Sequence, residues 1–304
     1  MTAAITFANV TKRFAAVTAL AGVTLDVHRG EMFGLIGPDG AGKTTAIRLM
    51  CGLVHADGGE IRVLGYDPVR EHRRLTDSVG YLSQRFTLYG DLSVDENIAF
   101  FAAIHGVRAF HSRRDQLLAM TQLTPFRTRR ADRLSGGMKQ KLALACTLVH
   151  EPDLILLDEP TTGVDPVSRR EFWKLLSEFL AQGVTILMST PYLDEAERCT
   201  RVALLHEGRV LALDEPARLR AAMPGQVVEL LAGSAPGLLD LIRRMPGVDD
   251  AQAFGERVHV RLHDGTEKGL ADFIAALPDT PLRDAAVRPV PASLEDVFIA
   301  RLAS

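Results

Sequence analysis

Residues 37–44 read Gly37-Pro38-Asp39-Gly40-Ala41-Gly42-Lys43-Thr44, which fits the phosphate-loop pattern G-x-x-x-x-G-K-[ST] at every fixed position. An apolar run of strand length, Met32–Ile36, comes just before, and Thr45–Gly52 follows with apolar residues at helical spacing. A strand that turns through glycines into a helix directs several backbone N–H groups at one point, with the positive end of the helix dipole behind them. This segment therefore predicts a site for a polyphosphate.

The loop side chains suit the parts of an ATP molecule and its Mg²⁺ ion. Lys43 can reach the β- and γ-phosphate oxygens, Thr44 can hold Mg²⁺, and Thr45 can support the α-phosphate. Three glycines let the backbone approach the phosphates with no Cβ in the way: Gly37, Gly40 and Gly42. We expect the whole run, with Pro38, Asp39 and Ala41, to contact the nucleotide.

Length and composition favour a two-domain globular protein. A chain of 304 residues exceeds the size at which one core usually stops growing, and 47% hydrophobic and 24% charged residues are ordinary values. A net charge of −3 gives no electrostatic case for nucleic acid as a partner. No apolar stretch approaches the ~20 residues of a membrane span, and Met1–Phe14 lacks the features of a signal peptide. Three cysteines fall in apparent helices and are expected to be buried, reduced side chains: Cys51, Cys146 and Cys199.

Up to about residue 220 the chain alternates strand-like and helix-like segments, which predicts an α/β fold with a largely parallel sheet. The predicted strands are Ile5–Val10, Val23–Val27, Met32–Ile36, Glu60–Val63, Val79–Leu82, Leu154–Leu157, Val184–Met188 and Val202–Leu205. Between about residues 90 and 150 the strand pattern disappears, so a helical subdomain is expected there. Its helices are predicted at Val94–His105, Asp115–Leu123 and Gly137–Val149.

A second, smaller pattern begins after Pro224-Gly225, so we predict domains at residues 1–222 and 223–304. The order βαββαβ plus a closing helix predicts a ferredoxin-like α+β unit. Its expected elements are Gln226–Leu231, Gly237–Met245, Val248–Phe254, Val258–Leu262, Lys268–Leu277, Ala285–Pro289 and Leu294–Leu302, the last capped by Ser293. No motif in this unit carries chemistry, and a stabilising, dimerising or docking role is favoured over ligand sensing.

Two further segments supply catalytic chemistry. Leu154–Asp158 is a buried-strand run that ends in a carboxylate, and Asp158 can hold Mg²⁺ in its outer coordination sphere. Glu159 follows directly and can polarise an attacking water as a general base. A lone strand ending in Asp-Glu is unspecific, but here Leu134-Ser135-Gly136-Gly137-Met138 precedes it and a phosphate loop lies upstream.

With these segments together, the sequence resembles the ATP-binding cassette (ABC) ATPases. Leu134-Ser135-Gly136-Gly137 matches the family signature, although Met138 replaces the usual Gln. The resemblance implies that Ser135, Gly136 and Gly137 cap the γ-phosphate of an ATP held by the opposite subunit. Such a site would again use a helix N-terminus.

Other positions match the family one by one. The resemblance implies that the aromatic side chain of Phe14 stacks on adenine, although a core phenylalanine is the alternative. It also implies that Gln84 touches Mg²⁺ or water, and that Asp165, in the run Thr161–Asp165, is the acid of a loop that crosses the dimer interface.

Position 191 departs from the family pattern. The family places a histidine there that donates a hydrogen bond to the γ-phosphate, whereas this chain has Pro191, which has neither a side-chain donor nor a backbone N–H. We expect Thr190 to cap a helix Pro191–Cys199 whose first residue is the proline. Thr190 and Tyr192 are the two candidates for a partial replacement of the histidine.

The closing run Pro291–Phe298 resembles the C-terminal end of ATPase subunits of ABC-2-type bacterial exporters. The resemblance implies a peripheral subunit on the cytoplasmic face of the bacterial inner membrane. It would pair with a second ABC ATPase chain, alike or different, and drive separate transmembrane permease subunits. Two alternatives stay open: a weakly hydrolysing or regulatory subunit in an asymmetric pair, and a non-transport ABC ATPase. The sequence does not identify the transported compound, because the resemblance implies that substrate contacts lie in the membrane subunits.

Overall fold

The computed structural model describes residues 3–84, 88–231, 237–263, 267–277 and 287–302, and it divides into two compact units, Met1–Pro216 and Ala217–Ser304. Each unit is described by itself. Among the described residues there is no helix long and apolar enough to cross a membrane.

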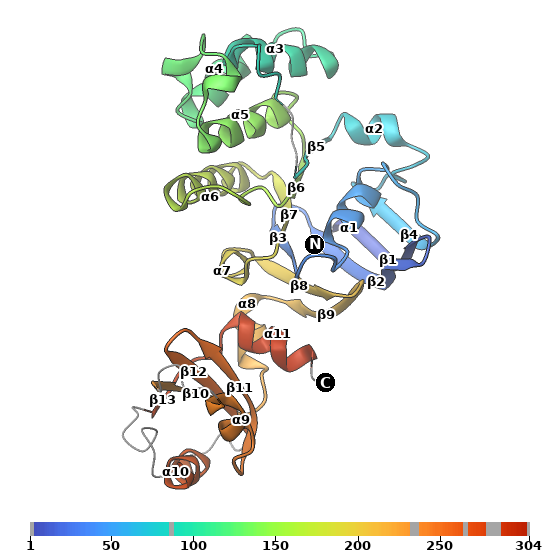
Figure 1. Cartoon of the computed structure of the whole chain (residues 1–304). Helices are drawn as coiled ribbons and strands as arrows, with labels where there is room; N and C mark the ends of the chain where they lie inside the picture. The colour runs from blue at the N-terminus through green and yellow to red at the C-terminus, as the bar shows by residue number, and fades with distance from the viewer. Residues whose placement is uncertain (1–2, 85–87, 232–236, 264–266, 278–286, 303–304) are drawn as a thin grey trace. The chain divides into compact units, whose positions relative to one another are not determined.

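A six-stranded sheet forms the centre of the first unit, in the order β5-β6-β7-β3-β8-β9 (Figure 1). All neighbouring strands pair in parallel except β9, which is antiparallel to β8. The prediction of a largely parallel sheet is therefore confirmed. The strands are β3 (Met32–Ile36), β5 (Val79–Leu82), β6 (Leu154–Asp158), β7 (Thr185–Thr190), β8 (Arg201–His206) and β9 (Arg209–Asp214).

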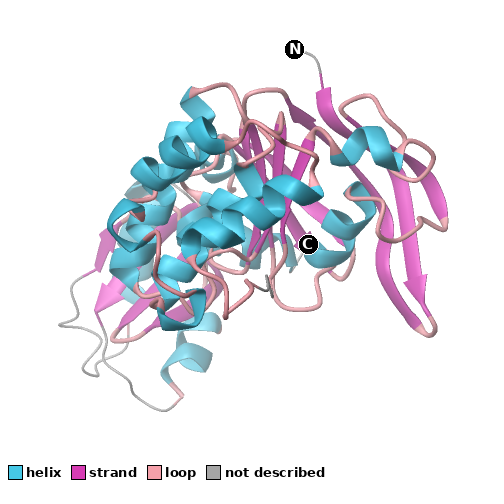
Figure 2. Cartoon of the chain, turned by 90° about the horizontal axis from the view of Figure 1, so that it is seen from above, coloured by secondary structure: helices cyan, strands magenta, loops and turns pink. Residues whose placement is uncertain are grey.

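A second, antiparallel sheet of three strands has the order β2-β1-β4, and Figure 2 shows its long strands beside the central ones. One hydrophobic core joins Phe7 of this sheet, Ile47 of helix α1 and Leu35 of the central sheet, all buried. Helix α1 is therefore enclosed by apolar side chains from both sheets, which fixes the loop that precedes it. The elements are β1 (Ala3–Phe14), β2 (Val17–His28), β4 (Gly58–Val63), α1 (Lys43–Met50) and the short α2 (His72–Thr76).

The predicted helical insert is present between β5 and β6. Its first helix begins with a capping box, in which the Ser93 hydroxyl accepts from the Glu96 amide and the Glu96 carboxylate accepts from the Ser93 amide. The last helix begins at the signature segment, with Ser135 as its N-cap. The helices are α3 (Val94–Ile104), α4 (His111–Met120) and α5 (Gly136–Leu148), with 3₁₀ turns at Thr124–Phe126 and Ala131–Arg133.

Among the helices and strands of this unit, the short helix α2, strand β9 and helix α6 were not predicted. Strand β9 carries the short apolar run Val210-Leu211-Ala212-Leu213, which was not recognised as a strand, and it is only partly buried along its length. Helix α6 (Pro166–Ala181) has an ordinary start signal, because Asp165 accepts hydrogen bonds from the Val167 and Ser168 amides at 3.1 and 3.0 Å and Pro166 occupies the first turn. Sequence reasoning gave Asp165 only its family role at the dimer interface and did not predict that it caps α6.

The predicted helix Pro191–Cys199 is wrong in its boundaries. Strand β7 continues to Thr190, which pairs with Ile36 of β3, and helix α7 covers only Leu193–Ala196. Parallel pairing keeps Thr190 extended, so Pro191 lies in the connection between strand and helix. The Thr190 hydroxyl does accept from the Tyr192 amide at 3.1 Å, but as a turn contact that follows the strand.

The three cysteines are buried and free, as predicted. Burial raises the pKa of each thiol, to about 12 for Cys199, because the thiolate would lose its hydration. These side chains therefore stay protonated and act as small apolar residues.

The second unit contains a four-stranded antiparallel sheet in the order β11-β12-β10-β13. This order and the βαββαβ sequence of elements confirm the predicted ferredoxin-like arrangement. Its core includes Val228, Ile242, Val260 and Phe273, all buried. Ser293 caps the closing helix as predicted, since its hydroxyl accepts from the Asp296 amide at 3.1 Å. The elements are α8 (Pro216–Ala221), β10 (Gln226–Leu231), α9 (Leu238–Arg243), β11 (Val248–Phe254), β12 (Arg257–Leu262), α10 (Glu267–Ala276), β13 (Val287–Pro289) and α11 (Leu294–Leu302).

Candidate functional site

The phosphate loop joins the end of β3 to the start of α1, as the sequence predicted. Gly42 has φ 104°, in the left-handed region, and a Cβ there would lie 2.5 Å from the Ala19 carbonyl oxygen. Only glycine fits this turn without strain. The loop is also tied to the core, because the Gly208 amide donates to the Ala41 carbonyl at 3.0 Å. The chain therefore curls tightly and in a fixed position just before Lys43.

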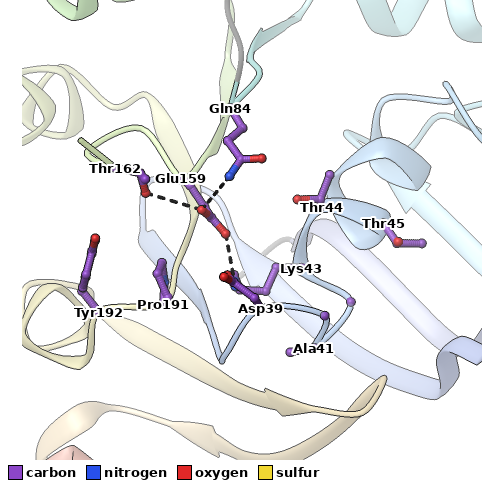
Figure 3. Close-up of a pocket in the computed structure, with 12 residues that line it drawn as sticks. Asp39, Ala41, Lys43, Thr44, Thr45, Gln84, Glu159, Thr162, Pro191 and Tyr192 are labelled. Atoms are coloured by element: carbon purple, nitrogen blue, oxygen red, sulfur yellow. Dashed lines mark hydrogen bonds and ion pairs between the residues drawn. The ribbon is translucent and has the colours of Figure 1, made fainter. Parts of the chain in front are cut away.

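A cavity of about 430 Å³ opens beside this loop (Figure 3). Segments far apart in the sequence meet in it: the phosphate loop, the end of β5, the residues after β6 and the residues after β7. It is lined by Asp39, Gly40, Ala41, Gly42, Lys43, Thr44, Thr45, Gln84, Glu159, Thr162, Pro191 and Tyr192.

Lys43 supplies a buried positive charge to this cavity. Its side chain is 3% exposed, and its ammonium group donates to the carbonyl oxygens of Gly37 at 2.8 Å and Pro38 at 3.0 Å. The same nitrogen lies 3.2 Å from a carboxylate oxygen of Glu159. Lys43 is therefore held in place by the loop backbone and already contacts an anion of this chain.

Glu159 places its carboxylate at the centre of the cavity. Its other oxygen accepts from the Gln84 amide nitrogen at 2.9 Å and from the Thr162 hydroxyl at 3.4 Å (Figure 3). The backbone of Glu159 has φ 48°, a conformation that is strained for a residue with a Cβ and that concentrates at functional sites. Its amide donates to the Ser189 hydroxyl at 3.0 Å, which fixes this conformation. The structure thus brings Lys43, Gln84 and Glu159 together.

Two of the three residues predicted to hold Mg²⁺, Thr44 and Asp158, are in direct contact. One Asp158 oxygen accepts from the Thr44 hydroxyl at 3.0 Å and from the Ser189 hydroxyl at 2.7 Å. Gln84 turns its amide nitrogen to Glu159, so its amide oxygen is the atom that could face a metal. In the described ranges no three His, Cys, Asp or Glu side chains form a metal cluster. The donor set of one carboxylate, one hydroxyl and one amide fits Mg²⁺, which binds through few protein oxygens together with substrate phosphates and water.

Several residues predicted to contact the nucleotide or Mg²⁺ are not among the described residues that line this cavity: Phe14, Gly37, Pro38, Asp158 and Ser135–Gly137. Phe14 ends β1, is 48% exposed, and has the Lys12 ammonium 5.2 Å from its ring centroid, so the core-residue alternative does not apply. The Ser135 hydroxyl accepts from the Met138 amide at 3.3 Å at the start of α5, where Ser135 and Gly136 are exposed.

Sequence reasoning overlooked two residues of the site. The Ser189 hydroxyl contacts both the Asp158 carboxylate and the Glu159 amide, and the Thr162 hydroxyl contacts the Glu159 carboxylate. Tyr192, which was predicted as a candidate, lines the cavity beside Pro191. Thr190 is fully buried and its hydroxyl donates to Glu195 at 2.7 Å, so it is not placed to replace the missing histidine. Tyr192 is the remaining candidate. The carboxyl ends of β6 and β7, which are adjacent in the sheet, are the signal that could have located Ser189 and Thr162.

Comparisons with known proteins agree with this geometry. Residues 20–162 match the family described as "ABC transporter". The chain is 40% identical over 304 residues to the probable multidrug ABC transporter ATP-binding protein YbhF of Escherichia coli, covering 98% of this chain and 52% of that protein. It therefore spans about half the length of that relative.

Other relatives are matched over nearly their whole length. The Nod factor export ATP-binding protein I of Paraburkholderia xenovorans is 37% identical, with 92% of this chain and 96% of the relative covered. The daunorubicin resistance ATP-binding protein DrrA2 of Streptomyces coeruleorubidus is 34% identical, with 95% and 91% covered.

Solved structures are similar to this chain over about 70% of its length. The structure of cbiO1 from Clostridium perfringens has a TM-score of 0.66 and 28% identity, covering 73% of this chain and 92% of that one. A dimeric bacterial ABC transporter cassette has a TM-score of 0.63 and 26% identity, covering 69% and 98%. The chain belongs to the family of ABC transporter ATP-binding subunits, whose cassettes bind and hydrolyse ATP.

Proposed function

We propose that this chain hydrolyses MgATP in a cassette pair that powers export through separate membrane subunits. The observation that carries the proposal is the meeting of Lys43, Gln84 and Glu159 in the cavity beside the phosphate loop. A cation for phosphate oxygens, an amide and a carboxylate base are the groups that γ-phosphoryl transfer to water requires.

Each residue has a distinct part in this reaction. The Glu159 carboxylate accepts a proton from a water molecule, whose oxygen bonds to the γ-phosphorus while the bond to the β–γ bridging oxygen breaks, giving ADP and inorganic phosphate. Lys43 neutralises charge on the phosphate oxygens, and it must exchange part of its contact with Glu159 for the nucleotide. Thr44, Gln84 and Asp158 would hold Mg²⁺, which supplies charge neutralisation at the phosphates when bound.

The signature segment is assigned to the partner's nucleotide. Ser135, Gly136 and Gly137 start a helix and would direct amide groups at the γ-phosphate held by a second cassette chain. The exposure of Ser135 and Gly136 in this chain and the dimeric form of a related cassette support this assignment. Phe14, exposed at the end of β1, is proposed to stack on the adenine.

ABC-2-type permease subunits at the cytoplasmic face of the bacterial inner membrane are the proposed membrane partners. The names of two relatives refer to Nod factor export and daunorubicin resistance, which supports the export direction. Residues 1–222 would form the ATPase domain, and residues 223–304 a stabilising, dimerising or docking domain.

ATP should bring two chains together through Ser135. In the slowly hydrolysing variant Glu159→Gln, MgATP is expected to produce a dimer, and adding Ser135→Arg should abolish it, because a bulky cation then occupies the contact with the opposite phosphate site. Analytical ultracentrifugation with and without MgATP measures both. Equal association of the two variants would remove the signature segment from the interface.

Pro191 favours a second candidate, a mixed pair in which this chain contributes the weaker hydrolytic site. Proline at the cavity wall cannot donate to the γ-phosphate, whereas the signature segment can still complete the site of a partner.

Restoring the donor tests this asymmetry directly. Pro191→His should raise the ATPase rate of the purified chain, by up to about 10²–10³-fold, the usual effect of one preorganised hydrogen bond to developing charge. Pro191→Ala is the matched control, since like Pro191→His it removes the ring and restores the backbone N–H, but it adds no side-chain donor. Rapid turnover by the wild-type chain, with no gain from histidine, would show that another residue performs this role.

A further inference from the structure

A buried carboxylate that lies outside the cavity connects two of its walls. Glu195 of α7 is 1% exposed, and its oxygens accept hydrogen bonds from the hydroxyls of Thr161 at 2.6 Å and Thr190 at 2.7 Å. The Arg169 guanidinium of α6 lies 3.6 Å from it. We call these four residues the Glu195 clasp.

The two threonines belong to different segments of the candidate site. Thr161 lies two residues after Glu159. The Thr162 amide donates to the Glu159 carbonyl and closes the turn that contains Thr161, and the Val164 amide donates to the Thr161 carbonyl in the turn that follows. Through Thr161, the clasp therefore holds the turn that carries the proposed general base.

Thr190 holds the opposite wall. Its hydroxyl donates to Glu195 and accepts from the Tyr192 amide at 3.1 Å, so both hydrogen-bonding roles of this hydroxyl are used. Arg169 adds a second contact, because its guanidinium lies 4.9 Å from the centroid of the Tyr192 ring. The clasp thus fixes Tyr192 and the adjoining Pro191, which both line the cavity.

Burial of the Glu195 carboxylate is difficult to explain by a contribution to stability alone. Burying an ionised group is unfavourable unless it is paired and fully hydrogen-bonded, and an apolar residue of similar volume often serves stability equally well. Here both hydrogen-bond donors come from segments that end at the cavity, and hydroxyl–carboxylate bonds of this length are strong and directional.

We propose that Glu195 is a positioning residue, which keeps Glu159 and the Pro191–Tyr192 wall in register for attack on the γ-phosphate. The proposal rests on the proposed ATPase activity. Glu195 touches no reacting atom. Its proposed role is to align the Glu159 side and the Pro191–Tyr192 side of a site that lacks the histidine donor.

The test removes the hydroxyls one at a time. Thr161→Val and Thr190→Val should each lower kcat for ATP at least about tenfold, because small displacements of a catalytic group reduce rates strongly, while KM stays within about twofold. Thr161→Ser keeps the hydroxyl and should restore kcat. Thr121→Val is the matched control, since Thr121 is equally buried and donates to the Leu117 carbonyl at 2.7 Å in the helical insert.

Amide hydrogen exchange gives a second readout that does not depend on turnover. Thr190→Val and Glu195→Gln should speed exchange at Thr162 and Val164, on the opposite side of the clasp, whereas Thr121→Val should not. Absence of ATP hydrolysis by the wild-type chain would refute the proposed function. The exchange data would still test whether the Glu195 clasp holds the turn after Glu159. Unchanged exchange at both amides, or a kcat in Thr161→Val equal to that of the wild type, would overturn the clasp.

Discussion

Replacing Glu159 with glutamine should lower the rate of ATP hydrolysis by about 10²–10⁴-fold, the usual contribution of a general base. Glutamine keeps the shape of the side chain but cannot take the proton of the attacking water. MgATP should bind at least as tightly, because Lys43 loses the carboxylate that now lies 3.2 Å from it and becomes more available to the nucleotide. Phosphate release gives the rate, and calorimetry gives the affinity.

Glu31→Gln is the control for this variant. Like Glu159, Glu31 is a buried carboxylate that is paired with a cation of the same unit. Its partner is Arg201, whose guanidinium lies 3.3 Å away. Its replacement should lower stability and leave the rate constant of folded protein unchanged. An ATPase rate in Glu159→Gln close to the wild-type value would exclude Glu159 as the base and leave the catalytic assignment without a proton acceptor.

The parts of the site that are local in sequence could be predicted from the sequence. The phosphate loop depends on glycine spacing and on the strand and helix around it, all within about twenty residues. The same holds for the order of elements in the second unit, where alternation and turn residues predicted a ferredoxin-like arrangement. In both places short-range propensity and the final fold agree, so no distant contact had to be known.

The parts that depend on distant contacts were missed. Thr190 carries an N-cap pattern, but pairing with Ile36 extends the strand through it, and this partner lies more than 150 positions away in the chain. Sequence reasoning also gave no reason to connect Thr161 with Glu195, 34 positions apart. Such contacts follow from the position of β7 between β6 and β3 in the sheet, which strand patterns alone do not specify.

Lys43→Ala should weaken MgATP binding by about 10–100-fold, since a hydrogen bond to a charged group contributes about 1.5–3 kcal/mol. Alanine removes the only side-chain cation among the residues described as lining the cavity. Calorimetry or a fluorescent nucleotide measures the affinity, and Lys141→Ala is the control. Lys141 is also a buried lysine with a carboxylate partner, Glu171, but it belongs to α5 and lies outside the cavity.

A second variant separates the loss of the phosphate contact from a local disturbance. Lys43→Ala leaves the Glu159 carboxylate buried beside the empty position, and an unpaired buried charge can repel the nucleotide or destabilise the loop. Lys43→Ala combined with Glu159→Gln removes that charge. If Lys43→Ala and the double variant both bind MgATP more weakly than Glu159→Gln does, the lost affinity comes from the contact between Lys43 and the phosphates. If the double variant binds as tightly as Glu159→Gln alone, Lys43 serves to neutralise Glu159, and the phosphates are held by the loop backbone.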